Sequence, residues 1–198
     1  MREPEIRARW SQRILEWLAE DGAARGTAAL RQLDSESRRI IDQASALSWI
    51  PFGSHHALMR SVQSAFSHQP FFETYADISE AALTMPMFEG LIRPLVRLLD
   101  RKAMVRGFPN GWAATIRGAG QPEVVQGDHD RVNTFVHFRA VPEGLAHDRV
   151  FRESVRGLLM ALMRRGEIPG VVSADYGAAS DGLLSYTMRS HQPAPAAF

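Results

Sequence analysis

The sequence contains no cysteine among its 198 residues and only one lysine, Lys102. The absence of cysteine excludes disulfide bonds, thiolate zinc sites, iron–sulfur clusters and a cysteine nucleophile. Arginine therefore carries nearly all the positive charge, a bias that a GC-rich genome explains more simply than a demand for bidentate anion binding.

Excess charge and long apolar runs are also missing. The formal net charge is +1, so no global basic field favours a nucleic-acid partner. No apolar run approaches the roughly 18 residues of a membrane span, and the charged residues 1–5 do not resemble a secretory signal. We therefore expect a cytoplasmic protein that binds neither a membrane nor nucleic acid.

Hydrophobic periodicity predicts helices first, then strands and a late helix. Helical spacing of apolar residues recurs in 4–20, 27–47 (with a possible break and new cap at Asp34-Ser35), 54–67, 73–83, 86–99 (with a kink at Pro94) and 148–165. Period-two alternation predicts strands at 112–117 and 131–141, and "GVVSADY" and "GLLSYTMRS" read as a closing hairpin. This order predicts an α+β fold, with an N-terminal helical layer packed on a small antiparallel sheet and one late helix.

The first predicted helix carries Trp10, Ile14 and Trp17 on one stripe. An isolated helix of this length is marginal in water and needs a surface to pack against, either its own core or a partner. Because tryptophan is typical of binding hot spots, we predict a homodimer or protein-partner interface through these three residues. The expected organisation is an N-terminal amphipathic helix and linker at 1–26, a single α+β domain at 27–190, and a disordered tail at 191–198.

The stretch "ALSWIPFGSHHALM" at 46–59 combines a helix stop with two adjacent histidines. Pro51 ends one helix and Ser54 can cap the next. On a helix, His55 and His56 point about 100° apart and rarely hold one ion together, so we expect no metal site here. The stretch is a structural corner first, and His55 or His56 can edge a pocket.

No other motif amounts to a reaction. The sequence has neither a Gly-x-Ser-x-Gly elbow nor a Walker loop. "GDHDR" around His129 could be a metal loop or a proton relay, but glycine and aspartate between strands are ordinary turn residues, which we favour. His137, flanked by Phe135 and Arg139, could face a cavity or, more commonly, the exposed side of a sheet.

Residues 46–190 carry a loose family pattern: "LSWIP", helices including "FEGLIRPLVRLL", then "GFPNGW", a strand pair, "RESVRGLLMALMRRGEIPGVV" and a final hairpin. In this order the chain resembles the 4-vinyl-reductase-like domains and a related paralogous family of uncharacterised bacterial proteins. Trp49 and Pro51 match the family's Trp-x-Pro turn, Trp112 matches the tryptophan before the sheet, and Gly157 and Gly166 match the late helix.

The resemblance implies an α+β fold shared with haem-NO-binding proteins and vesicle-tethering TRAPP subunits, often dimeric, with a pocket for small hydrophobic molecules. Against that pattern, the expected ligand-binding residues are Trp49, Phe52, His56, Trp112 and His137. The family's cysteine-rich zinc site is absent here, and no histidine matches the context of a proximal haem ligand. We therefore expect neither a metal nor a cofactor.

These observations predict a non-catalytic binding or regulatory module for a small hydrophobic ligand or a protein partner. The alternative is a cofactor-independent enzyme of the isomerase or cyclase type, with His56 or His137 as acid/base in an apolar pocket. A deep pocket with two titratable groups in hydrogen-bond reach would favour the enzyme. We also predict that Trp49 and Trp112 are largely buried where the helices meet the sheet.

Overall fold

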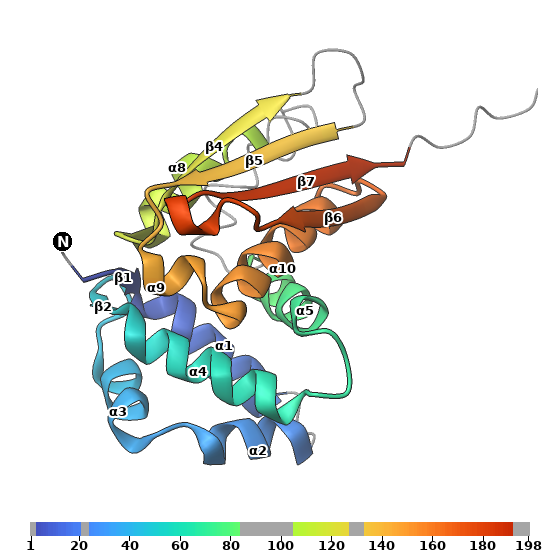
Figure 1. The fold of residues 1–198 in the computed structure, drawn as a ribbon. Helices are drawn as coiled ribbons and strands as arrows, with labels where there is room; N and C mark the ends of the chain where they lie inside the picture. Colours follow the sequence, from blue (N-terminus) through green and yellow to red (C-terminus); the bar gives the residue numbers. More distant parts are fainter. Residues whose placement is uncertain (1–2, 21–23, 84–104, 127–132, 192–198) are drawn as a thin grey trace, which may run out of the picture.

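The computed structural model describes residues 3–20, 24–83, 105–126 and 133–191. Three predictions lie outside these residues: the kinked helix over 86–99, the turn around His129 and, apart from residue 191, the tail. Within them, the chain folds into helices and two antiparallel sheets, so the predicted α+β class is confirmed (Figure 1).

The α-helices are α1 (Ala8–Glu20), α2 (Ala24–Gln32), α3 (Ser35–Gln43), α4 (Phe52–Ala65), α5 (Phe71–Leu83), α8 (Phe108–Thr115), α9 (Glu143–Ala146) and α10 (Arg149–Arg165). The strands are β1 (Glu5–Arg7), β2 (Trp49–Pro51), β3 (Ile116–Arg117), β4 (Gln121–Gln126), β5 (Asn133–Arg139), β6 (Gly170–Asp175) and β7 (Leu184–Ser190). A short 3₁₀ turn, η1 (Ala179–Asp181), joins β6 to β7.

The larger sheet has the strand order β4-β5-β7-β6, with every neighbouring pair antiparallel. Helix α10 packs against β6 and β7, and α5 packs along α10. Figure 1 shows the sheet at the top, α10 and α5 beneath it, and α1 to α4 at the bottom. As the alternation predicted, Val136 and Phe138 of β5 point into the core and are fully buried.

A close helix crossing holds α5 against α10. A Cβ added at Gly157 of α10 would lie 2.5 Å from the carbonyl oxygen of Phe72 and 3.0 Å from the Cβ of Tyr75. Only glycine lets the two backbones approach this closely. The N-terminus of α10 is capped by Asp148, whose carboxylate accepts a hydrogen bond from the backbone N–H of Phe151 at 2.9 Å.

The N-terminal segment is part of the core, which corrects two predictions. Residues 5–7 form the central strand of the order β2-β1-β3 and not the start of a helix, because Ile6 pairs with Ile50 and Ile116. Trp10 and Ile14 of α1 are buried within the chain itself, at 4% and 0% exposure. Of the three residues expected to anchor a subunit interface, Trp10 and Ile14 are instead part of the chain's own core, and Trp17 is partly buried against that core.

Residues 108–115 are helical and not extended, so the strand predicted over 112–117 is wrong except at Ile116 and Arg117. Phe108, Trp112 and Thr115 are spaced by four and three residues, which places them on one helix face, and all three are buried. The apparent alternation around Trp112 came from small residues that fit either structure.

Candidate functional site

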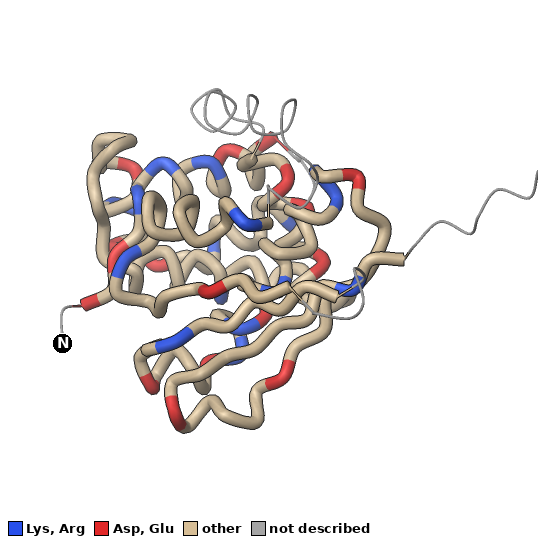
Figure 2. The backbone as a smooth tube through the Cα atoms, turned by 90° about the horizontal axis from the view of Figure 1, so that it is seen from above, with Lys and Arg blue, Asp and Glu red and all other residues tan. Residues whose placement is uncertain are grey.

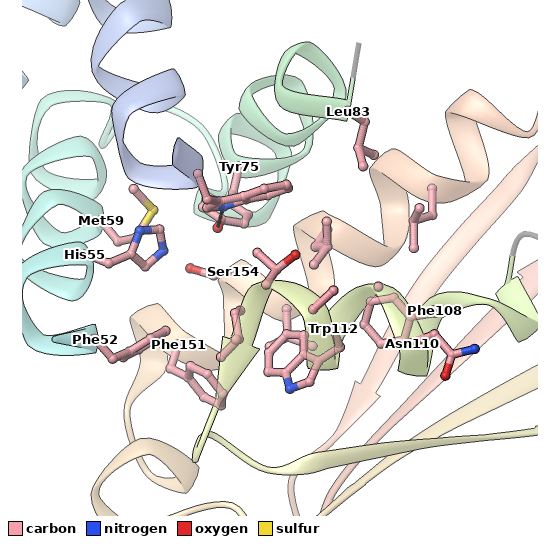
Figure 3. Close-up of a pocket in the computed structure, with 18 of the residues that line it drawn as sticks. Phe52, His55, Met59, Tyr75, Leu83, Phe108, Asn110, Trp112, Phe151 and Ser154 are labelled. Carbon is pink, nitrogen blue, oxygen red and sulfur yellow. Dashed lines mark hydrogen bonds between the residues drawn. The ribbon is translucent and has the colours of Figure 1, made fainter. Parts of the chain in front are cut away.

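A cavity of about 330 Å³ lies among α1, α4, α5, α8 and α10 (Figure 3). This volume falls at the lower end of the range of about 300–1,000 Å³ typical of small-molecule sites. Its described walls are mainly apolar, and their large side chains include Phe52, Met59, Leu83, Phe108, Trp112 and Phe151.

Aromatic contacts keep these walls in place. The ring of Phe52 meets that of Phe151 edge-on, with centroids 5.8 Å apart. Trp112 packs edge-on against Phe138 of β5 at 4.8 Å, and its indole N–H donates to the carbonyl of Gly120 at 3.1 Å. Because that N–H already has an acceptor, Trp112 contributes mainly apolar surface to the cavity.

One end of the cavity is polar and is organised by two adjacent residues of α1. The indole N–H of Trp10 donates to the hydroxyl oxygen of Tyr75 at 3.2 Å. Ser11 Oγ and His55 Nδ1 share a hydrogen bond of 3.0 Å. We call Trp10, Ser11, His55 and Tyr75 the polar end; all four are buried, and His55 is only 2% exposed.

Burial keeps the titratable groups of this polar end uncharged. Loss of water, together with a smaller effect of the neighbouring His56, lowers the pKa of His55 to about 3. Burial raises the pKa of Tyr75 to about 12, although the hydrogen bond from Trp10 acts in the opposite direction. Near pH 7, both side chains are therefore neutral hydrogen-bonding groups.

The second pocket histidine, His56, belongs to an ion-pair cluster at the rim. Its Nε2 lies 2.8 Å from Asp148 Oδ1, and Arg60 Nη2 lies 3.0 Å from Asp148 Oδ2. Burial alone would raise the pKa of Asp148, but hydrogen bonds from Phe151, His56 and Arg60 outweigh it and lower the pKa. This cluster ties α4 to the N-terminus of α10.

Three of the predicted ligand-binding residues, Phe52, His56 and Trp112, line the cavity. The other two lie elsewhere. Trp49 lies partly buried in β2, with the guanidinium carbons of Arg7 and Arg117 at 4.0 and 4.3 Å from its ring, and is not among the described residues that line the cavity. His137 is half-buried in β5, where its Nδ1 lies 2.9 Å from Ser185 Oγ.

Local patterns indicated only one member of the polar end, His55, as a residue that can edge a pocket. They placed Trp10 at an interface and did not single out Ser11 or Tyr75. A usable signal was present, because Tyr75 shares a helical stripe with Phe71 and Ile78, and a tyrosine inside an apolar stripe usually has a partner for its hydroxyl group.

Neither a patch of like charges nor a metal-binding group marks a second site in the described chain. Figure 2 shows basic and acidic residues interspersed along the described backbone. Among the described residues, no group of three or more histidine, aspartate or glutamate side chains could hold a metal ion. Within the same residues, every helix is too short or too polar to cross a membrane.

Comparison with known proteins finds no matching family model and no matching curated protein, but it does find solved structures. The Fe(II) unliganded H-NOX protein from K. algicida matches with a TM-score of 0.65 and 9% identity, over 98% of this chain and 100% of that chain. A Cs H-NOX mutant matches with a TM-score of 0.66 and 11% identity, over 95% and 98% of the two chains.

An oxygen-binding H-NOX domain related to soluble guanylate cyclases matches with a TM-score of 0.56 and 12% identity, over 93% of both chains. At such low identity these likenesses show the fold alone. The chain has the H-NOX fold, which confirms the haem-NO-binding part of the expected fold resemblance. The 4-vinyl-reductase-like part gains no support from these structures.

Proposed function

We propose that this protein is a non-catalytic binding or regulatory module whose cavity takes a small hydrophobic ligand. The observation that carries the proposal is the cavity of about 330 Å³, with apolar walls fixed by aromatic contacts. Cavities of this kind, with a few polar groups at one end, are the usual form of a small-molecule site. An oxygen-binding H-NOX domain is among the solved neighbours, so the fold is compatible with a ligand-binding role.

Haem, which the description of one solved neighbour names, does not fit the described residues well. No arginine or lysine is among the described residues that line the cavity, so the two carboxylates of haem would lack a cationic partner there. The two histidines on that lining are already engaged, His55 with Ser11 and His56 with Asp148. The sequence of 84–104 contains no histidine, cysteine or tyrosine.

We therefore predict that the protein does not form a stoichiometric haem complex. Titration of the purified chain with hemin should give no saturable, one-to-one shift of the Soret absorption band. A saturable shift at one haem per chain would contradict this prediction.

The enzyme alternative has less support. An efficient general acid or base has a pKa near the working pH, whereas burial moves the pKa of His55 to about 3 and that of Tyr75 to about 12. His137, one of the two proposed acid/base residues, is not among the described residues that line the cavity. The other, His56, is held by Asp148 at the rim.

A protein partner held through α1 is also less well supported. It would need Trp10 and Ile14 at the surface, but both side chains are buried in the chain's own core. We therefore place the ligand in the cavity and do not extend the proposal to an interface on α1.

A fluorescent apolar probe tests the proposed function. N-phenyl-1-naphthylamine should bind one-to-one with an increase in fluorescence. Ser154 of α10 lines the cavity, and its hydroxyl donates to the carbonyl of Val150 at 2.7 Å. Ser154→Phe should fill the cavity and weaken binding at least about tenfold, a loss of about 1.4 kcal/mol.

The matched control, Ser154→Ala, removes the hydroxyl group without filling the space and should bind the probe as the wild type does. Circular dichroism of both variants would verify that they are folded. Probe binding that is equal in Ser154→Phe and Ser154→Ala would show that the probe does not occupy this cavity, and would contradict the proposal.

A further inference from the structure

We infer, on the basis of the proposed function, that the cavity selects an uncharged ligand with an aromatic body and a hydrogen-bond acceptor that receives the hydroxyl hydrogen of Tyr75. The inference rests on the hydroxyl hydrogen of Tyr75, for which the described residues offer no acceptor, on the absence of charge partners along the described walls, and on the aromatic rings that line the cavity. Each of these observations restricts a different property of the ligand.

Tyr75 supplies the donor. Its oxygen accepts the indole N–H of Trp10 at 3.2 Å, so the position of the ring and the use of one lone pair are fixed by α1. No acceptor for its hydroxyl hydrogen is present among the described residues, although the residue is only 4% exposed and lines the cavity (Figure 3). A buried donor without an acceptor is costly, and a ligand oxygen in the cavity would remove that cost.

The described walls exclude a charged ligand. They contain no arginine, lysine, aspartate or glutamate, and His55 is held neutral by burial. The other histidine on the described lining, His56, is already hydrogen-bonded to Asp148. A carboxylate or an ammonium group placed in this cavity would therefore be buried without a charge partner among the described residues, which is far less favourable than its solvation by water.

The aromatic walls define the body of the ligand. Phe52, Phe151, Trp112 and Phe108 form one continuous row of buried rings along the cavity, with successive centroids 5.8, 6.5 and 5.9 Å apart (Figure 3). Aromatic rings prefer offset-stacked or edge-to-face contacts, so these walls are suited to a flat ring system. Together the three restrictions describe a neutral aromatic compound with a carbonyl, ether or hydroxyl oxygen at one end.

Three naphthalenes with different substituents test the inference by isothermal titration calorimetry on the full chain. These are 2-acetonaphthone, which has a neutral acceptor; 2-ethylnaphthalene, which has none; and 2-naphthoate, which is an anion. We expect the ketone to bind about tenfold more tightly than the hydrocarbon, the size of effect that one net hydrogen bond gives. The anion should bind more weakly than either.

Tyr75→Phe should remove the preference, because the ketone loses about tenfold in affinity while the affinity of the hydrocarbon is unchanged. The unchanged hydrocarbon affinity also verifies that the cavity is intact in the variant. Tyr176→Phe is the matched control, since the Tyr176 hydroxyl donates to Glu153 at 3.2 Å and Tyr176 is not among the described residues lining the cavity. This control should keep the preference.

The outcomes separate the two proposals. Equal binding of the ketone and the hydrocarbon by the wild type would overturn the inference about Tyr75 and leave a hydrophobic binding cavity in place. Binding of the anion as tightly as the ketone would overturn the requirement for a neutral ligand. If N-phenyl-1-naphthylamine and all three naphthalenes fail to bind, the proposed function itself is wrong.

Discussion

Two histidines in this molecule make the same contact in opposite settings. His55 Nδ1 lies 3.0 Å from Ser11 Oγ, and His137 Nδ1 lies 2.9 Å from Ser185 Oγ. The first pair is buried at the polar end of the cavity, whereas His137 is half-buried on the face of β5 opposite Val136 and Phe138. The hydrogen bond is alike in both, so burial, which lowers the pKa of His55 to about 3, is what keeps His55 neutral near pH 7.

The two faces of β5 extend this comparison to the whole sheet. Phe138 is fully buried and touches Trp112, Phe108 and Tyr186 edge-on. Phe135, three residues earlier, is half-buried and stacks on His137 with centroids 6.3 Å apart. The side chains of the inner face pack behind the cavity, whereas those of the outer face are only partly buried. Substitutions on the two faces should therefore lower the free energy of unfolding by very different amounts.

The largest difference in the free energy of unfolding is expected between Trp112, which packs on the inner face of β5 through Phe138, and Phe135 on the outer face. Trp112→Ala should lower the free energy of unfolding by about 3–5 kcal/mol, because a large buried side chain leaves a hole that the packed core closes only partly. Phe135→Ala should cost less than about 1 kcal/mol, as is usual for partly exposed positions. Chemical denaturation of both variants measures the difference, and equal losses would contradict the contrast between the two faces.

The next largest effect is expected at Gly157, where α5 and α10 cross closely. Gly157→Ala should lower the free energy of unfolding by about 1–3 kcal/mol, because the new methyl group collides with the backbone of α5 and forces the helices apart. Gly144→Ala is the matched control, since a Cβ added there meets nothing within 4 Å. Denaturant midpoints that move equally in the two variants would show that the close approach at Gly157 is not required.

The pH dependence of the free energy of unfolding tests the buried, neutral state of His55 directly. Below about pH 6.5 the unfolded chain protonates His55, but the folded chain does not until about pH 3. The stabilising contribution is therefore complete above pH 6.5 and is lost as the pH falls towards 3, by up to about 1.4 kcal/mol per pH unit. His55→Gln should flatten the dependence of unfolding free energy on pH in this window.

His137→Gln serves as the control for this prediction, because it removes a histidine with the same serine contact from the half-buried face. A slope between pH 6.5 and pH 4 that survives in His55→Gln, compared with the wild type and with His137→Gln, would contradict the assignment of His55 as the buried neutral histidine.

The smallest expected effect is at the rim. Asp148→Ala removes the cap of α10 and should lower the free energy of unfolding by about 1 kcal/mol at pH 7. Because the folded-state pKa of Asp148 is lowered, its contribution is present above the ordinary value near 3.8 and is lost as the pH falls through the lowered value. The variant and the wild type should therefore become more alike in stability at strongly acidic pH.

Asp34→Ala is the comparison for the rim, because Asp34 caps α3 through the N–H of Ser37 at 2.8 Å and its described contacts are only local. It should cost less than Asp148→Ala, since Asp148 also pairs with His56 and Arg60. A larger loss for Asp34→Ala in thermal or chemical unfolding would contradict the importance of the rim cluster.

Much of the fold could be predicted from local patterns. The apolar spacing of 148–165 gave α10, the alternation of 131–141 gave the inner face of β5, and a cap at Asp34 separates α2 from α3. The patterns failed where pairing with distant segments decided the structure. Residues 5–7 are extended because they lie between β2 and β3, which are more than 40 residues away along the chain.

The sequence by itself determined the absence of thiol chemistry, the near-neutral charge and the periodicities that fix most of the helices and strands β5, β6 and β7, because these depend on single residues or on neighbours within a few turns. The tertiary structure alone decided the cavity. Trp10 meets Tyr75 65 residues later, and Ser11 meets His55 44 residues later. Such contacts follow from which helix faces pack together, and no local spacing encodes that choice.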